Sequence, residues 1–434
     1  MHINFNQMSR HWPGFWVPTL YFTEGLPNII VTTVALIMFK RLGFDNADTA
    51  LYTSWFSLPW MLKPFWSPVV ELVGRKRTWI LTLQLLIGVA LACVGFTLPM
   101  SNNLQWLMIF FFLIAFSSAT HDIAADGFYM IELTEQQQSL FVGIRSTFFR
   151  LSMITGQGVL VMLAGALEAY LKVPSKAWAW TFFISAILFF LLVAVHAYII
   201  PKSSNDCPSP MEKSPWADYL QTFLDFFKKP HIGLALTFML FYRMPEAMLV
   251  KICPLFFLDP NDVANGGLGL TTADIGFAQG TIGVIGLILG GILGGVLVSL
   301  HGFRRWLWPM VLSISLPNAV YILMAYYQPT EMLFIGSCIF IEQLGYGFGF
   351  TAYMLYMLYF SQGKNQTAHY AFCTGFMTLG LILPGMVAGY LQEALGYLNF
   401  FIFVMCLCPV TFVVSALIKF DPLFGKSATK KQKE

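Results

Sequence analysis

Charged residues are scarce in this sequence. Among its 434 residues only 11% are Asp, Glu, Lys or Arg, whereas 57% are hydrophobic and 16% aromatic. A soluble domain carries roughly 25% charged residues, so this chain lacks the polar cover that a surface facing water requires. We conclude that lipid is its natural solvent.

Short alternating apolar segments, which are typical of membrane β-barrel strands, are also lacking. The apolar runs are instead long, on the order of 20 residues, which is the length that a bilayer requires of a helix. Only helices and closed barrels satisfy every backbone polar group in lipid. The sequence therefore predicts an all-α membrane protein.

The cysteines show no pattern of paired spacing. Their number is odd, no CxxC occurs, and most lie inside apolar runs, at Cys93, Cys207, Cys253, Cys338, Cys373, Cys406 and Cys408. This predicts small core residues without a disulfide framework, a metal site or a cofactor. The net charge of +3 is too small to indicate a nucleic-acid partner. Residues 1–12 are polar, and the apolar run after them is too long for a cleaved signal peptide.

Twelve long apolar segments divide the chain into two halves of six. The predicted spans of the first half are 13–38, 48–70, 79–99, 104–128, 139–167 and 178–200. Those of the second half are 231–258, 272–300, 306–327, 330–358, 367–391 and 397–420. The predicted organisation is an N-terminal six-helix bundle (1–200), a cytoplasmic linker (201–230), a C-terminal six-helix bundle (231–420) and a basic cytoplasmic tail (421–434).

Lys and Arg concentrate on one side of the predicted membrane. Arg75, Lys76 and Arg77 follow the second span, Arg304 and Arg305 follow the eighth, and the linker and tail are rich in Lys. Cytoplasmic loops carry the excess of Lys and Arg in membrane proteins. Both termini are therefore expected in the cytoplasm.

One loop sequence occurs twice. Residues 67–76 align with 295–304, and each copy lies between the second and third span of its half. The pair resembles the loop motif of the major facilitator family, in which an acid precedes Gly-Arg-Lys. Glu71 and Arg75 would then have gating or structural roles, while Ser299 replaces the acid in the second copy. Tight glycine turns in both copies argue against the alternative that these are only cytoplasmic loop charges.

Several ionisable residues fall inside the predicted spans. They are Glu24, Asp122, Arg243, Glu246 and Glu342, in spans 1, 4, 7 and 10. A charge at the bilayer centre costs about 3 kcal/mol and indicates a functional site by default. The family resemblance implies that these four spans line a central cavity, where substrate binds between the two halves.

The neighbours of the two glutamates repeat at helical spacing. One predicted stripe contains Tyr21, Glu24, Asn28 and Thr32, and the other contains Glu342, Tyr346, Gly349, Tyr353 and Tyr356. Carboxylate, amide and tyrosine side chains suit a ligand rich in hydroxyls and amides, because rings stack on sugar faces while their polar groups form hydrogen bonds. The alternative is that the tyrosines only pack between helices.

Pro245 predicts a kink in the seventh span. Arg243 and Glu246 lie three residues apart on either side of it, a spacing at which side chains meet on a helix. Two interpretations remain open, an ion pair that a substrate carboxylate splits and a permanent structural pair. Arg243 is the best candidate to bind an acidic ligand, because it stays protonated and binds carboxylates through two hydrogen bonds.

The fourth span carries Asp122 and Asp126 on one face. We expect Asp122 to pair with Arg150 and to carry a proton by alternating between this arginine and water. Asp126 and Arg145 are expected to form a fixed pair near the cytoplasmic boundary. Lys63 is expected to snorkel to the cytoplasmic interface.

Four segments resemble the AmpG-type anhydromuropeptide permeases. Tyr21–Pro27 is similar to their F-x-x-G-L-P opening, and Leu58–Pro68 to their K-F-L-W-S/A-P segment. Phe116–Asp126 matches S-A-x-Q-D-I-x-x-D, and Arg150–Leu151 matches Y-R-L-G, so the resemblance covers the first half. His121 replaces the usual Gln; it either joins the proton path, since His titrates near neutral pH, or only packs between helices.

The resemblance implies a monomeric, proton-coupled importer of amino-sugar fragments of the cell wall, in the inner membrane. Another oligosaccharide, a siderophore or an acyl-CoA-type solute is the alternative substrate, because the second half matches only in topology. His121 and Asp126 also form the H-x-x-x-x-D pattern of some acyltransferases, but they do not share a helix face, so no enzyme is expected. A receptor without transport activity would have no reason to carry charges in its cavity.

Overall fold

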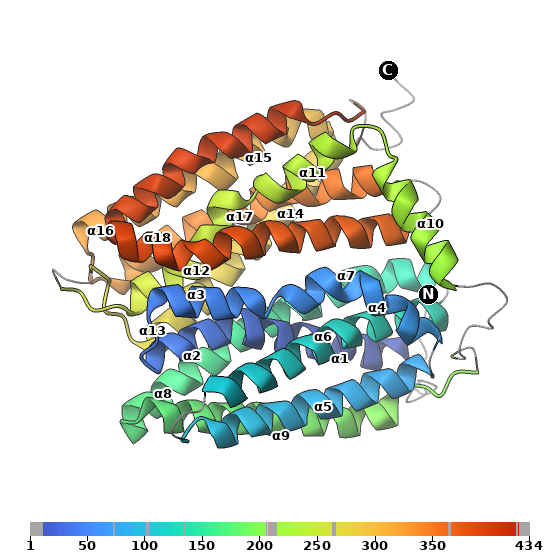
Figure 1. Cartoon of the computed structure of the whole chain (residues 1–434), viewed down its shortest axis with the longest axis horizontal. Coiled ribbons are helices and arrows are strands. Elements are labelled where there is room, and N and C mark those ends of the chain that lie inside the picture. Colours follow the sequence, from blue (N-terminus) through green and yellow to red (C-terminus); the bar gives the residue numbers. More distant parts are fainter. Residues whose placement is uncertain are drawn as a thin grey trace, which may run out of the picture. The chain divides into compact units, whose positions relative to one another are not determined.

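The computed structural model describes residues 12–72, 74–100, 104–133, 135–204, 206, 215–262, 266–362, 366–421 and 424. The described residues form helices and connecting turns, with no β-strand among them (Figure 1). Long helices run side by side within each part of the chain. The prediction of an all-α membrane protein is confirmed.

The first half of the chain forms long helices, several of them interrupted by short irregular turns. They are α1 (Pro13–Ile29), η2 (Ile30–Val34), α2 (Ala35–Arg41), α3 (Asn46–Trp55), α4 (Leu58–Leu72), α5 (Lys76–Thr97), α6 (Leu104–Glu132), α7 (Glu135–Met153), η3 (Ile154–Leu160), α8 (Val161–Leu171) and α9 (Pro174–Ile199).

The second half begins with a helix inside the predicted linker 201–230. This is α10 (Pro215–Phe227), whose Phe226 is fully buried against Phe360, Phe372 and Phe376. The helices that follow are α11 (Ile232–Phe241), α12 (Met244–Leu258), α13 (Thr272–Phe277), η4 (Ala278–Gly283), α14 (Val284–His301), α15 (Phe303–Ser315), η5 (Leu316–Asn318), α16 (Ala319–Tyr327), α17 (Met332–Ser361) and α18 (Gln366–Leu417).

Ten helical stretches of the described chain are long and apolar enough to cross a membrane. One of them is the long helix α18, which Gly396 divides in two with φ +74°. The predicted second span is absent from these ten, because it is broken into α3 and α4 between Trp55 and Leu58. Dividing α18 gives eleven helical segments and adding α3–α4 gives twelve, as predicted.

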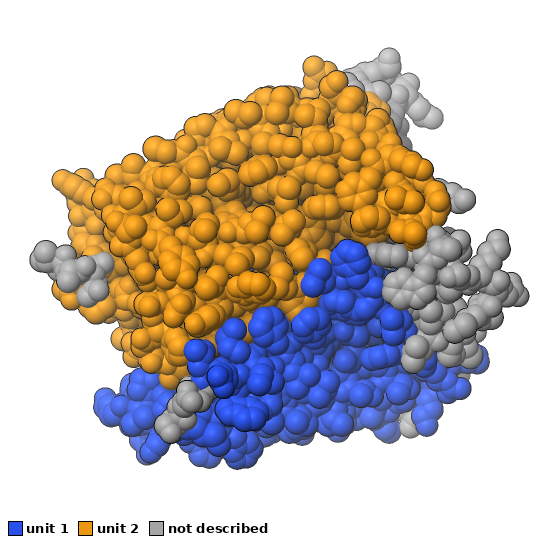
Figure 2. Space-filling model, viewed as in Figure 1, with its two compact units in different colours: residues 1–35, 62–215 blue, residues 36–61, 216–434 orange. Residues whose placement is uncertain are grey.

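Packing divides the chain into two compact units that differ from the two halves of the sequence (Figure 2). Unit 1 contains residues 1–35 and 62–215, and unit 2 contains residues 36–61 and 216–434. The end of the first membrane helix and the beginning of the second therefore pack with the C-terminal helices. The predicted boundaries of the two six-helix bundles stay a prediction.

Local sequence signals explain several helix ends. Asp45 caps α3 by accepting a hydrogen bond from the backbone of Asp48, and Thr271 and Asp274 form a reciprocal capping box at α13. The two repeated loops turn at Gly74 (φ +75°) and Gly302 (φ +86°), a backbone conformation that favours glycine. The predicted glycine turns are confirmed in both copies.

Small residues allow α14 and α17 to pack closely. Gly286, Gly290 and Gly294 repeat every fourth residue on α14, which resembles the small-residue stripes of membrane helix pairs. A Cβ on Gly290 would lie 2.1 Å from the carbonyl oxygen of Leu344, and one on Gly347 would lie 2.2 Å from that of Leu287. The nearest atoms at this crossing belong to the backbone, so a larger residue could not be accommodated by a side-chain movement.

We expect Gly290→Ala to destabilise the protein by about 1–3 kcal/mol, because the added methyl group has no space. Thermal unfolding in detergent measures the change. The control is Gly295→Ala on the same helix, where a Cβ meets nothing within 4 Å. Alanine should be neutral or stabilising there, because its helix propensity exceeds that of glycine by about 1 kcal/mol. Equal unfolding temperatures for both variants would contradict the close approach of the two helices.

Candidate functional site

Unit 1 contains a cluster of ionisable side chains between its packed helices. The Lys63 ammonium group on α4 forms an ion pair with the Asp122 carboxylate on α6. Glu24 on α1 lies beside Asp122 and is 7% exposed. The expected snorkelling of Lys63 is therefore wrong. Its ammonium group lies instead against the part-buried carboxylate of Asp122, where pairing offsets the cost of burial.

The expected pairing of Asp122 with Arg150 is also wrong. Arg150 makes no ion pair within the described residues, and Lys63 occupies the position of the cation. The sequence suggested Arg150 because it lies on the next helix along the chain. Lys63 is distant in sequence, and only the packing of α4 against α6 brings it to Asp122.

A second ion pair lies one helical turn further along α6. Arg145 of α7 approaches Asp126 at 3.0 Å, and the Tyr21 hydroxyl donates to the same carboxylate at 2.8 Å. The Arg145 guanidinium group also lies 4.4 Å from the centre of the Tyr21 ring, a cation–π contact. The predicted Asp126–Arg145 pair is confirmed.

This cluster holds more carboxylates than cations. Glu24, Asp122 and Asp126 face only Lys63 and Arg145, and Oε2 of Glu24 is buried without a hydrogen-bond partner among the described residues. An unpaired buried charge is costly, and a carboxyl group in such a place tends to bind a proton instead. The arrangement can therefore hold one exchangeable proton.

His121 belongs to a separate buried chain of polar side chains. Its Nε2 lies 2.9 Å from Nε2 of Gln84, and Oε1 of Gln84 lies 2.8 Å from Nδ1 of His196. The Gln84 amide thus joins α5 to both α6 and α9. These contacts favour the packing alternative for His121, and its part in a proton path stays a prediction.

Unit 2 contains the remaining predicted site residues. Arg243 precedes the first turn of α12 and donates a hydrogen bond to the Tyr346 hydroxyl of α17. Its guanidinium carbon lies 4.8 Å from the centre of the Phe350 ring. Nε of Arg243 is buried without a partner among the described residues. The arginine is thus held by aromatic side chains and keeps a donor for another acceptor.

Arg243 and Glu246 form no ion pair in the described structure, although their spacing allowed one. The reason is local. Helix α11 ends at Phe241 and α12 begins at Met244 with Pro245 in its first turn, so Arg243 lies outside the helical geometry that the spacing assumed. The predicted kink at Pro245 is confirmed as a break between two helices.

The two predicted site glutamates of unit 2, Glu246 and Glu342, have different surroundings. Glu342 accepts hydrogen bonds from Tyr321 at 3.0 Å and from Gln343 at 2.9 Å. Glu246 lies near it, and Oε2 of Glu246 is buried without a partner among the described residues. The cluster around Arg243 therefore keeps one unsatisfied carboxylate oxygen and one unsatisfied donor.

Tyr353 packs beside this cluster, with its ring stacked on Phe350 at a centroid distance of 6.0 Å. Its hydroxyl donates to the carbonyl of Met239 at 2.5 Å, and its ring stacks on Tyr242 with centroids 5.4 Å apart. The side chain is fully buried. These contacts favour the alternative that this tyrosine packs between helices.

The other predicted residues are more simply placed. Asn28 is half-buried on α1, near the π-helical turn η2. Arg75 is exposed and precedes the first residue of α5. The side chain of Glu71 lies outside the described part of the structure, so its gating or structural role stays a prediction.

A buried polar network within unit 2 has no counterpart among the sequence predictions. Nδ2 of Asn46 lies 2.6 Å from Oε1 of Gln392, 2.9 Å from the Tyr397 hydroxyl and 3.1 Å from Asp259. Lys40 pairs with Asp259 at 2.6 Å. Lys40, Asn46 and Asp259 lie just outside the predicted spans, where polar residues are common, so the sequence carries no signal for this network.

Lys251 on α12 was also missed. Its side chain is 7% exposed and donates to the Thr53 hydroxyl at 3.0 Å, with no carboxylate at ion-pair distance among the described residues. The signal was present in the sequence, since Lys251 lies inside the predicted span 231–258. The same criterion that selected Arg243 selects it.

Comparison with models of known protein families identifies the family of this chain. The profile of the Major Facilitator Superfamily matches residues 19–361. The chain belongs to the Major Facilitator Superfamily. It is therefore a multi-pass membrane transporter of this superfamily rather than an enzyme.

Proteins with similar sequences include permeases. The anhydromuropeptide permease of Escherichia coli (strain K12) is 24% identical over 396 residues, which cover 88% of this chain and 75% of the permease. A protein named AmpG 4 from Rickettsia conorii is 25% identical over 421 residues, covering 93% of this chain and 96% of that protein. The resemblance to AmpG-type proteins thus extends into the second half.

Solved structures of the superfamily share the fold. A bacterial homologue of the human lysosomal transporter Spinster superposes with a TM-score of 0.70 at 14% identity, covering 96% of this chain and all of that one. The nucleoside transporter NupG gives a TM-score of 0.68 at 15% identity, covering 95% of this chain and 100% of that chain. At this identity the likeness concerns the fold alone.

We expect Lys63→Met to cost about 1–3 kcal/mol of stability, because it leaves the part-buried Asp122 carboxylate without its partner. The double variant Lys63→Met/Asp122→Leu should recover most of this loss, since both charges are then removed. Thermal unfolding of the two single variants and the double variant measures the coupling. Arg150→Gln is the control and should not be coupled to Asp122→Leu. Coupling of Asp122 to Arg150 instead of Lys63 would contradict the observed pair.

Proposed function

We propose that this chain is a proton-coupled importer of amino-sugar compounds derived from the cell wall, located in the inner membrane and working as a monomer with both termini in the cytoplasm. The relation to anhydromuropeptide permeases supports the substrate class. The charge imbalance of the unit 1 cluster carries the proposal of proton coupling.

Protons would bind where Glu24 meets Asp122. In the proton-free state these two carboxylates compete for Lys63, because Arg145 is committed to Asp126. A proton on Glu24 or Asp122 relieves their repulsion and leaves one carboxylate for each cation. Lys63 therefore takes the role that the sequence suggested for Arg150, that of the cation competing with the proton for Asp122.

The ligand would be bound in part by Arg243, Glu246, Glu342 and Tyr346. Arg243 keeps an unsatisfied donor, and Glu246 keeps an unsatisfied acceptor that suits a hydroxyl or amide N–H of a sugar. Aromatic rings on α17 flank the arginine, as in many sites that bind sugar faces. A muramic acid derivative offers both a carboxylate for Arg243 and hydroxyls for the glutamates.

Proteoliposomes with an imposed pH gradient test the whole proposal. The chain is expected to accumulate labelled GlcNAc–1,6-anhydro-MurNAc, with or without its peptide, only when the outside is acidic. Dissipating the gradient with a protonophore should abolish accumulation. Accumulation of another oligosaccharide, a siderophore or an acyl-CoA in its place would refute the substrate class, and uptake that ignores the gradient would refute proton coupling.

Glu24→Gln and Asp122→Asn should each abolish accumulation driven by a pH gradient while sparing exchange of labelled for unlabelled substrate. The amides cannot bind and release a proton, but they preserve shape and most hydrogen bonds. Uptake and counterflow in the same vesicles separate the two activities. The matched control is Glu331→Gln, an exposed residue at the N-cap of α17, which should accumulate normally. Unchanged accumulation in both cluster variants would remove this site from the coupling mechanism.

Arg243→Lys should weaken binding of an acidic ligand about tenfold or more, since a bidentate hydrogen-bonded ion pair is lost. A neutral disaccharide of two GlcNAc units should lose much less. Ligand-induced thermal shifts provide both affinities. The exposed Arg305→Lys serves as control. Equal losses for acidic and neutral ligands would indicate that Arg243 only stabilises the fold.

A further inference from the structure

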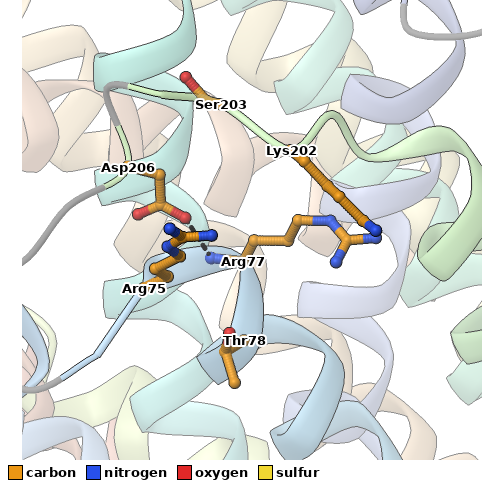
Figure 3. Close-up of a pocket in the computed structure, with 6 residues that line it drawn as sticks. All are labelled: Arg75, Arg77, Thr78, Lys202, Ser203 and Asp206. Carbon is orange, nitrogen blue, oxygen red and sulfur yellow. Dashed lines mark hydrogen bonds between the residues drawn. The ribbon is translucent and has the colours of Figure 1, made fainter.

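A small basic cavity lies where α5 begins and the chain leaves α9 (Figure 3). Its volume is about 170 Å³, and its lining residues are Arg75, Arg77, Thr78, Lys202, Ser203 and Asp206. None of them belongs to the ionisable clusters described above. The cavity therefore requires its own explanation.

The single carboxylate of the cavity, that of Asp206, is engaged in hydrogen bonds to the backbone. Asp206 accepts hydrogen bonds from the backbone N–H groups of Lys76 at 2.8 Å and Arg77 at 2.9 Å, so it caps the beginning of α5. These bonds hold its negative charge against the helix. The three cationic side chains of the cavity are consequently only partly neutralised.

Arg77 is fixed in position and still has donors to offer. Its Nε donates to the carbonyl of Ile200 at 3.1 Å and its Nη2 to that of Ala197 at 2.7 Å, which ties it to the end of α9. A guanidinium group has five N–H donors, and within the described part of the structure Arg77 uses two of them in these bonds, which leaves three. In Figure 3 the ends of Arg77 and Lys202 reach toward the same side of the cavity.

Arg75 and Lys202 complete the positive charge. Both side chains are exposed, and neither forms an ion pair within the described part of the chain. Gathering three cations around one cavity without a free anion is unfavourable, because like charges repel. A bound anion removes this repulsion, and a phosphate group suits the planar donors of the arginines.

The position of the cavity indicates where that phosphate comes from. Both α5 and α9 are long and apolar enough to span the membrane, and the cavity lies at their ends. Along α9, exposed apolar side chains form a stripe at helical spacing that leads toward it: Ile184, Ile187, Leu191, Val195 and Tyr198. A phosphate in the cavity is therefore at headgroup depth, and acyl chains have an apolar surface beside it.

We propose that Arg75, Arg77 and Lys202 form a binding site for the phosphate of an anionic phospholipid headgroup. Basic pockets between membrane helices at a membrane surface bind such headgroups through charge and hydrogen bonds. The site is separate from the substrate and proton sites and does not depend on the proposed substrate.

The test is a titration of the purified full-length protein in neutral detergent with phosphatidylglycerol, followed by native mass spectrometry and thermal unfolding. Wild-type protein should bind the lipid and unfold at a higher temperature, whereas phosphatidylcholine should have little effect. The double variant Arg75→Gln/Lys202→Gln should bind phosphatidylglycerol about thirtyfold more weakly, given the usual contribution of each basic residue near a membrane surface. Arg77 is left intact because it also holds the end of α9.

The matched control is Arg304→Gln/Arg305→Gln, which removes the same charge from the corresponding loop of the second half. It should keep the wild-type affinity for phosphatidylglycerol. Equal weakening by both double variants would mean non-specific attraction and would overturn the site. Inorganic phosphate provides the last arm: it should neither stabilise the protein nor displace the lipid at millimolar concentration. Saturation by inorganic phosphate would overturn the assignment to a lipid headgroup.

Discussion

The cost of a charge inside lipid governs this structure. Each unpaired ionisable group costs about 3 kcal/mol at the bilayer centre, and the two units offset that cost differently. Unit 1 pairs cations with carboxylates, as in Lys63 with Asp122 and Arg145 with Asp126. Unit 2 surrounds Arg243 with a tyrosine hydroxyl and aromatic rings. In unit 1 this pairing leaves the Glu24 carboxyl group without a cation of its own, and in unit 2 Arg243 forms no ion pair with any described residue.

The surplus carboxyl group of Glu24 and the unpaired guanidinium group of Arg243 suit different functions. A surplus carboxylate among paired charges is neutralised most simply by a proton, which is small and arrives by water. An arginine without a counter-ion stays charged and is neutralised by a ligand with a carboxylate. The same physical cost thus favours a proton site in unit 1 and an anion-binding residue in unit 2, which is the division of roles in the proposed symporter.

The sequence revealed which residues carry buried charge better than it revealed their partners. Glu24, Asp122 and Glu342 were evident because hydropathy identifies spans and a charge within a span is conspicuous. The partner of Asp122 was not evident, because Lys63 lies 59 residues away and only helix packing sets that distance. The spacing of Arg243 and Glu246 misled for a related reason, since it assumed helical geometry at Arg243, which lies in the break between α11 and α12. Loop glycines were predictable, because a positive φ is a local property of one residue.

The packing of residues 36–61 with unit 2 could not be predicted from any local sequence signal. Asn46 and Lys40 bind Asp259, Gln392 and Tyr397, so the tips of the first two membrane helices are tied into unit 2 by buried hydrogen bonds. Each helix must then pass from one unit to the other along its length. The first does so directly after the π-helical turn Ile30–Val34, and the second between Pro59 and Pro64. Both are places where regular backbone hydrogen bonding is interrupted and a helix bends most readily. The irregular turns and prolines of these spans therefore have a mechanical reason: they lie where one membrane span contributes its two ends to two separately packed units.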